Sequence, residues 1–133
     1  MNILIIGSGG REHAIAMALS KSPIKNQLFA LPGNPGINEY CECIDIDPSN
    51  FREIKNFSKN NNIDLVIVGP EVPICEGITD YLKEYKIDVF APSLEASKLE
   101  SSKKFTKEIA FENNIPTGEA KWFDNYADAF LYL

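Results

Sequence analysis

The residues with the clearest chemical potential form a glycine-rich loop near the start of the chain. Residues 7–13 read GSGGREH and directly follow the apolar run 3–6, ILII. The backbone N–H groups of such a loop can approach an anion closely, and the N-terminus of a following helix adds a favourable dipole. Arg11 either adds a two-pronged guanidinium contact to a phosphate or is a solvated surface residue. The loop therefore predicts a phosphate site.

Two common fingerprints for larger phosphate ligands are not met by this loop. A dinucleotide fingerprint needs a third glycine where the chain has Glu12, and a carboxylate at the end of the second strand, where it has Leu31. A nucleoside-triphosphate loop needs Gly-Lys-Ser/Thr, which is missing. A smaller phosphorylated ligand fits better. A dinucleotide-dependent oxidoreductase stays as the alternative with different chemistry, and a test of NAD binding discriminates between them.

Two further loops follow apolar runs. Residues 32–36 read PGNPG, and residues 69–71 read GPE. Such proline- and glycine-rich segments are typical of rigid turns. Glu71 would place a carboxylate at the edge of the sheet where a ligand binds, with ribose hydroxyls or an amine as partners.

The elements that must position these loops alternate along the chain. Apolar, β-branched runs predict buried strands, and segments of helical spacing follow them. We expect strands at 3–6, 27–31, 41–46, 65–68 and 87–90, with helices at 11–20, 51–58 and 74–85. This order predicts an α/β fold with a doubly wound, mostly parallel sheet. Since such sheets bind ligands beyond the carboxyl ends of their strands, the three loops should converge on one site.

The helix 11–20 is predicted from Ala14, Met17 and Ala18, which recur at intervals of three and four residues. Beyond Phe90 the character of the sequence changes. The segment 94–113 is mostly helical and rich in lysine.

After that helix we expect a short strand at 120–123 and a helix that begins at Tyr126 and continues to Leu133. We predict two domains, 1–96 and 97–133. Because the chain stops within that last helix, we also expect it to be a fragment of a longer protein.

Composition excludes some classes of function. The chain has 133 residues, with 13 Lys+Arg against 19 Asp+Glu and a net charge of −6, which argues against a nucleic-acid partner. It has no apolar run of the ~18 residues that a membrane span requires, and its first residues do not resemble a signal peptide. We therefore expect a cytoplasmic protein without a membrane partner; the sequence gives no indication of its oligomeric state.

The three cysteines, Cys41, Cys43 and Cys75, are expected to be reduced thiols. A zinc site needs more ligands than Cys41 and Cys43, and the one histidine, His13, lies elsewhere in the sequence. We assign no metal ligand.

Taken together, the motifs resemble one known family. Residues 7–13, 32–36, 68–73 (VGPEVP) and 99–107 (LESSKKFTK), followed by 115–117 (IPT), are similar in type and order to those of the phosphoribosylamine–glycine ligase family, also called glycinamide ribonucleotide synthetase. The resemblance extends over the whole chain.

The resemblance implies a Rossmann-like, pre-ATP-grasp domain followed by the start of an ATP-grasp domain. It implies ATP-dependent ligation of glycine to 5-phosphoribosylamine, giving glycinamide ribonucleotide, ADP and phosphate in de novo purine biosynthesis. ATP and Mg²⁺ would be held mainly by parts beyond residue 133. The catalytic residues are then unknown from this chain, and the 133 residues alone should be inactive.

Carried over residue by residue, the resemblance implies that Gly9, Gly10 and Arg11 contact the phosphate of the substrate. Asn34 and Glu71 would line the ribosylamine side. These five positions match the family's first three motifs.

Lys103 matches the family lysine that reaches ATP, whereas Lys104 and Lys107 are either further contacts or a solvated helix face. Another ATP-grasp ligase remains an alternative, against which the loops 32–36 and 69–71 argue. A stand-alone phosphosugar-binding module is the alternative without enzyme activity.

Overall fold

The computed structural model describes residues 1–24 and 27–132. The chain divides into two compact units, Met1–Ser97 and Lys98–Leu133. The bounds of the first unit are close to those of the predicted domain 1–96.

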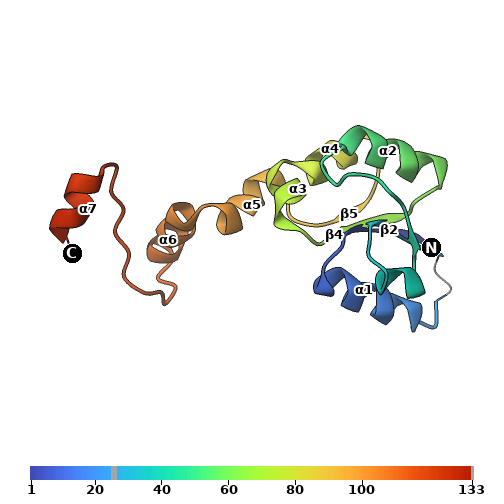
Figure 1. Ribbon diagram of the computed structural model, residues 1–133. Helices are drawn as coiled ribbons and strands as arrows, with labels where there is room; N and C mark the ends of the chain where they lie inside the picture. The colour runs from blue at the N-terminus through green and yellow to red at the C-terminus, as the bar shows by residue number, and fades with distance from the viewer. Residues whose placement is uncertain (25–26, 133) are drawn as a thin grey trace. The chain divides into compact units, whose positions relative to one another are not determined.

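The first unit is built on a sheet of five parallel strands (Figure 1). The strands are β1 (Asn2–Gly7), β2 (Gln27–Pro32), β3 (Glu42–Cys43), β4 (Leu65–Val68) and β5 (Val89–Phe90). Their order across the sheet is β3-β2-β1-β4-β5. In this register Ile5 of the central strand lies between Ala30 and Ile67. The predicted doubly wound α/β fold is confirmed.

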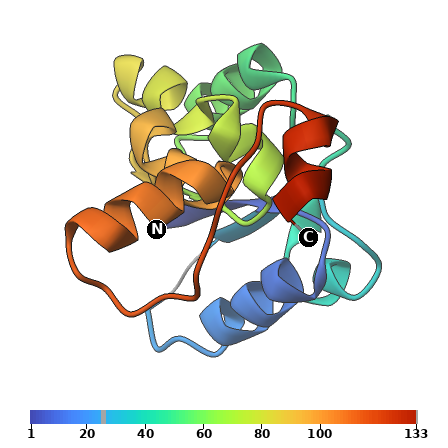
Figure 2. The ribbon, with the colours of Figure 1, turned by 90° about the vertical axis from the view of Figure 1, so that its left-hand side faces the viewer.

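Helices cover both faces of the sheet. On one face lie α1 (Gly10–Ser20) and the short 3-10 helix η1 (Ile37–Glu39), and on the other lie α2 (Phe51–Asn60) and α4 (Ile78–Glu84). Figures 1 and 2 show α1 and α2 on opposite sides of the strands. Right-handed crossovers require this change of face, because the chain adds β2 and β3 on one side of β1 and then β4 and β5 on the other.

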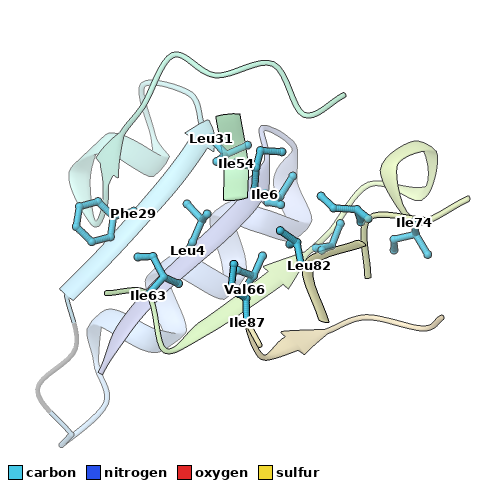
Figure 3. Close-up of a cluster of buried hydrophobic side chains, with 12 residues drawn as sticks. Leu4, Ile6, Phe29, Leu31, Ile54, Ile63, Val66, Ile74, Leu82 and Ile87 are labelled. Atoms are coloured by element: carbon cyan, nitrogen blue, oxygen red, sulfur yellow. The ribbon is translucent and has the colours of Figure 1, made fainter. Parts of the chain in front are cut away.

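The core has a layer on each face because both faces of the central strand are buried. Leu4 and Ile6 point towards α2 and α4, where they pack with Leu31, Ile54 and Leu82 (Figure 3). The neighbouring residues of β1 point to the opposite face. There Ile3 and Ile5 pack with Leu28, Ala16 and Ile37. A strand with two buried faces explains the unbroken apolar run at 3–6.

The helix predicted at 11–20 is formed, but the residues whose spacing predicts it are not its buried ones. Ala14, Met17 and Ala18 are exposed, and Ala16 is the fully buried apolar residue of this helix. Apolar residues lie on all sides of α1, so its spacing does not single out the buried face.

The single helix predicted at 74–85 is two helices, α3 (Glu71–Cys75) and α4. Gly77 separates them with a φ of +90°, a conformation that glycine adopts without a steric penalty. The third strand is also shorter than predicted, with two residues instead of the expected segment 41–46.

The second unit contains α6 (Lys103–Glu112) and α7 (Tyr126–Tyr132), and α5 (Leu94–Ser101) precedes α6. Ser102 caps α6 by accepting a hydrogen bond from the Phe105 N–H at 3.2 Å. The strand predicted at 120–123 is not formed, since no neighbouring strand pairs with this segment. Leu133, the last residue of the predicted final helix, lies outside the described residues. No helix within 1–24 and 27–132 is both long and apolar enough to cross a membrane.

Candidate functional site

A cavity of about 710 Å³ lies at the carboxyl ends of the strands. At this edge β1 and β4 are neighbours, and the connections that leave them run to opposite faces of the sheet. A crevice is expected at such a reversal of strand order. The cavity is lined by residues 7–12, Pro32, 47–49, 69–73 and Glu76. Of the three loops predicted to converge, the first and third do so; the second contributes Pro32.

The N-terminus of α1 supplies backbone donors to the cavity. Gly9 is the residue before the helix, and its carbonyl accepts the helical bond from the His13 N–H at 3.1 Å. The N–H groups of Gly10 and Arg11 therefore precede the first intrahelical hydrogen bond. A Cβ atom built on Gly10 meets no atom within 4 Å. This part of the loop is open to a ligand and suits an anion.

Arg11 connects the first loop to the third. Its guanidinium donates to the Gly69 carbonyl oxygen through Nη1, and its Nη2 lies 3.4 Å from Oε1 of Glu71. Both charged side chains are more than half exposed. An anion at the start of α1 would therefore find a guanidinium already held at the edge of the cavity.

Glu71 is the first residue of α3 and lines the same cavity. A hydrogen bond from its own backbone N–H holds the pKa of its carboxyl below the ordinary value, and the hydrogen bond and charge of Arg11 lower the pKa further. The carboxylate is thus ionised at neutral pH and able to accept hydrogen bonds from hydroxyl or amine groups.

Asn34 lies in the second loop and connects it to the first loop by a hydrogen bond. Its Nδ2 donates to the Ser8 carbonyl at 2.7 Å, and its Oδ1 accepts from the Ile37 N–H at 2.9 Å. It is not among the residues that line the cavity. The structure therefore brings Gly9, Gly10, Arg11 and Glu71 together and places Asn34 behind the first loop.

Sequence reasoning missed the wall formed by Asp47, Pro48 and Ser49. Oδ1 of Asp47 accepts hydrogen bonds from the backbone N–H and the hydroxyl of Ser49, both at 2.8 Å. These bonds, the backbone one first, lower the pKa of the Asp47 carboxyl. The predicted parallel sheet could have indicated this wall, because the loop after β3 must lie at the same edge as the loops after β1 and β4.

The comparison with known families concerns the same part of the chain. Residues 1–100 match the family described as phosphoribosylglycinamide synthetase, N domain. The chain belongs to this family. The match includes every residue that lines the cavity.

Relatives of this synthetase family align with the whole chain. Proteins named phosphoribosylamine–glycine ligase from Caldanaerobacter subterraneus subsp. tengcongensis and Mesorhizobium japonicum are 42% and 44% identical over 133 residues, which is 32% and 31% of their own lengths. The crystal structure of phosphoribosylamine–glycine ligase from Thermotoga maritima matches 90% of this chain and 26% of that chain, with 25% identity and a TM-score of 0.63. The chain thus spans about a third of the length of these curated relatives.

The lysines that the family resemblance singles out differ in their contacts. Lys104 lies 3.9 Å from the Glu108 carboxylate and 5.7 Å from the centre of the Trp122 ring. Lys107 donates to Oγ1 of Thr117 and to the Gly118 carbonyl, both at 2.7 Å. Lys103 is exposed at the first position of α6.

The cysteines lie outside the cavity. All three are free, and burial raises the pKa of the Cys41 thiol to about 11, with a smaller effect from Cys43. Cys41 is therefore a protonated thiol at neutral pH. Within the described part of the chain, no three His, Cys, Asp or Glu residues form a group that could hold a metal ion.

Proposed function

We propose that the chain is the phosphosugar-binding region of a phosphoribosylamine–glycine ligase. The observation that carries this proposal is the cavity lined by the start of α1, in which the Arg11 guanidinium lies 3.4 Å from the Glu71 carboxylate. A sugar phosphate that bears an amine has the matching groups, an anion at one end and hydroxyl and amine donors at the other. Membership of the synthetase family supports the same substrate.

In this proposal the phosphate of 5-phosphoribosylamine lies against Gly9, Gly10 and Arg11. The N–H groups of Gly10 and Arg11 donate to it, whereas the Gly9 N–H donates to Glu12. Glu71 accepts hydrogen bonds from the ribosylamine end and so orients the amine that is to be joined to glycine. Asn34 holds the first loop in place through Ser8. The work of this region is to bind and orient one substrate, which is a function compatible with a separate catalytic region in the rest of the protein.

We propose ATP and Mg²⁺ as the cofactors of the complete ligase, which is an ATP-grasp enzyme of de novo purine biosynthesis in the cytoplasm. ATP supplies the phosphoryl group that activates the glycine carboxylate, and Mg²⁺ neutralises phosphate charge. Lys103 would contact ATP. As the family resemblance implies, this proposal places the Mg²⁺ ligands mainly in parts of the ligase beyond residue 133.

Calorimetric titration of the chain with ribose 5-phosphate tests the proposal, with ribose as the ligand that lacks the phosphate. We expect ribose 5-phosphate to bind and ribose not to bind. Arg11→Gln should weaken binding about tenfold, since it removes a charge-assisted contact to the phosphate. Arg52→Gln removes the same charge from α2, away from the cavity, and should leave the affinity unchanged. Equal binding of ribose and ribose 5-phosphate would contradict the proposal.

A further inference from the structure

Glu12 occupies the position where the dinucleotide fingerprint has its third glycine. It lies in the first turn of α1, lines the cavity and is only 5% exposed. A carboxylate buried beside a site for a phosphate is unexpected on charge grounds, because the two groups repel each other. The contacts of Glu12 with the glycines around it explain why a carboxylate is buried there.

The Glu12 side chain fills space that three glycines leave open. A Cβ atom on Gly7 would lie 2.7 Å from Cγ and Cδ of Glu12, and one on Gly9 would lie 2.9 Å from Oε2. A Cβ atom on Gly69 would overlap the same carboxylate. In a dinucleotide fold, glycines at this loop make room for a pyrophosphate and for close packing of helix on strand. Here they make room for a side chain of the protein itself.

The carboxylate also uses one donor of the loop. Oε2 of Glu12 accepts a hydrogen bond from the Gly9 N–H at 2.6 Å. The loop donors left for a ligand are then those at the start of the helix, from Gly10 and Arg11 onwards. A second phosphate group placed against Gly9 would meet a carboxylate in place of an N–H donor.

We propose that Glu12 is a positioning and specificity-determining residue, which sets the loop for one phosphate monoester and excludes pyrophosphate ligands. This inference rests on the proposed function, because it concerns the same cavity. It explains why a loop with a glycine pattern close to the dinucleotide fingerprint serves a small sugar phosphate.

The test compares the affinities of the full chain for ribose 5-phosphate and for ADP-ribose, which carries a pyrophosphate. Glu12→Gln keeps the volume of the side chain and an oxygen that accepts from Gly9, but removes the charge. Glu12→Gly removes the whole side chain. Glu76→Gln is the matched control, since it removes a carboxylate from the same cavity without touching the glycines.

We expect the wild-type chain to bind ribose 5-phosphate and to discriminate against ADP-ribose. In Glu12→Gln the ratio of the two dissociation constants should shift at least about tenfold towards ADP-ribose, because the Glu12 carboxylate no longer repels a second phosphate placed against Gly9. Glu12→Gly should shift the ratio further and also weaken ribose 5-phosphate binding, whereas Glu76→Gln should leave the ratio unchanged. Circular dichroism of each variant monitors folding, and the Gln variant alone suffices if the Gly variant unfolds.

An unchanged ratio in Glu12→Gln, in a chain that binds ribose 5-phosphate, overturns the role of Glu12 and leaves the proposed function standing. An equal shift in Glu76→Gln also overturns it, because any cavity carboxylate would then have the same effect. A wild-type chain that binds neither ligand overturns the proposed function together with this inference.

Discussion

The two units of the chain differ in what happens to their large apolar side chains. In Met1–Ser97, apolar residues on both faces of the sheet are buried under helices. In the described part of Lys98–Leu133, Ala110 is the one buried apolar residue. Large apolar side chains are exposed there: Leu99, Phe111, Ile115, Trp122, Tyr126, Phe130, Leu131 and Tyr132.

The cavity lies in the unit that has a buried core. The first unit has its own core and a cavity whose walls come from four loops of that same unit. The second unit has helices but little buried apolar area, so it has little hydrophobic stabilisation of its own. The proposed binding of a sugar phosphate therefore depends on the first unit alone, whereas the proposed ATP contact of Lys103 belongs to the second.

Among the substitutions that test this difference in burial, Leu4→Ala should have the largest effect on the free energy of unfolding. Leu4 is completely buried in the centre of the sheet, and truncation there should lower the free energy of unfolding by about 3 kcal/mol. The matched variant Leu131→Ala, at a side chain that is 84% exposed, should change it by less than about 0.5 kcal/mol. Urea unfolding followed by circular dichroism measures both. Equal losses would show that the second unit has a core of comparable importance.

Glycine substitutions separate stability from binding within the first unit. Gly69→Ala should lower the free energy of unfolding by about 1 to 3 kcal/mol, since its Cβ would overlap the Glu12 carboxylate. Gly10→Ala has open space around the new Cβ, so it should retain stability while weakening ribose 5-phosphate binding at the start of α1. Thermal melts and calorimetry check the pair. Loss of stability without loss of affinity in Gly10→Ala would place the phosphate elsewhere.

The strands of the sheet were predictable because a central parallel strand buries both faces and so must be a continuous apolar run. The runs at 3–6 and 65–68 lie within β1 and β4. The segment 120–123 (AKWF) has aromatic residues that are common in strands but no neighbouring strand, and backbone pairing decides whether such a segment forms a strand. The buried face of α1 was not predictable because its apolar residues surround the helix.

The part of the candidate site that could be predicted is formed by residues that are adjacent in the sequence. Residues Gly9 to Arg11 form a loop before a helix, and their donor geometry follows from that position alone. The wall at Asp47 and the packing of Glu12 under Gly69 depend on contacts between segments far apart in the sequence. Asn34 matched a family motif, but its hydrogen bonds to Ser8 and Ile37 appear only in the folded loop.

Substitutions of the lysines in α6 test the proposed ATP contact of the second unit. On the proposed function, Lys103→Ala in the complete ligase should weaken ATP binding about tenfold, because it removes the proposed charged contact with ATP. Lys104→Ala is the matched control, because Lys104 already contacts Glu108 and Trp122. Equilibrium binding of a fluorescent ATP analogue measures both. The reverse result would transfer the ATP contact to Lys104.

The smallest effect concerns the protonation of Glu71. Its carboxyl has a lowered pKa in the folded chain, so it contributes stability that is complete above the unfolded value of 4.5 and is lost as pH falls through the folded pKa. In Arg11→Gln the carboxyl should titrate at a higher pH than in the wild type, yet below 4.5, because the backbone N–H bond remains. Carbon-13 NMR of the Glu71 carboxyl follows this. An unchanged titration in Arg11→Gln would show that the ion pair does not form in solution.

An NMR titration of the chain with ribose 5-phosphate, observed at the backbone amides, tests most directly whether the first unit binds the phosphate. We expect saturable shifts at Gly9, Gly10 and Arg11 and around Glu71, with the amides of α6 and α7 unaffected. Shifts confined to Lys98–Leu133, or no shifts at the start of α1, would contradict the assignment of phosphate binding to the first unit.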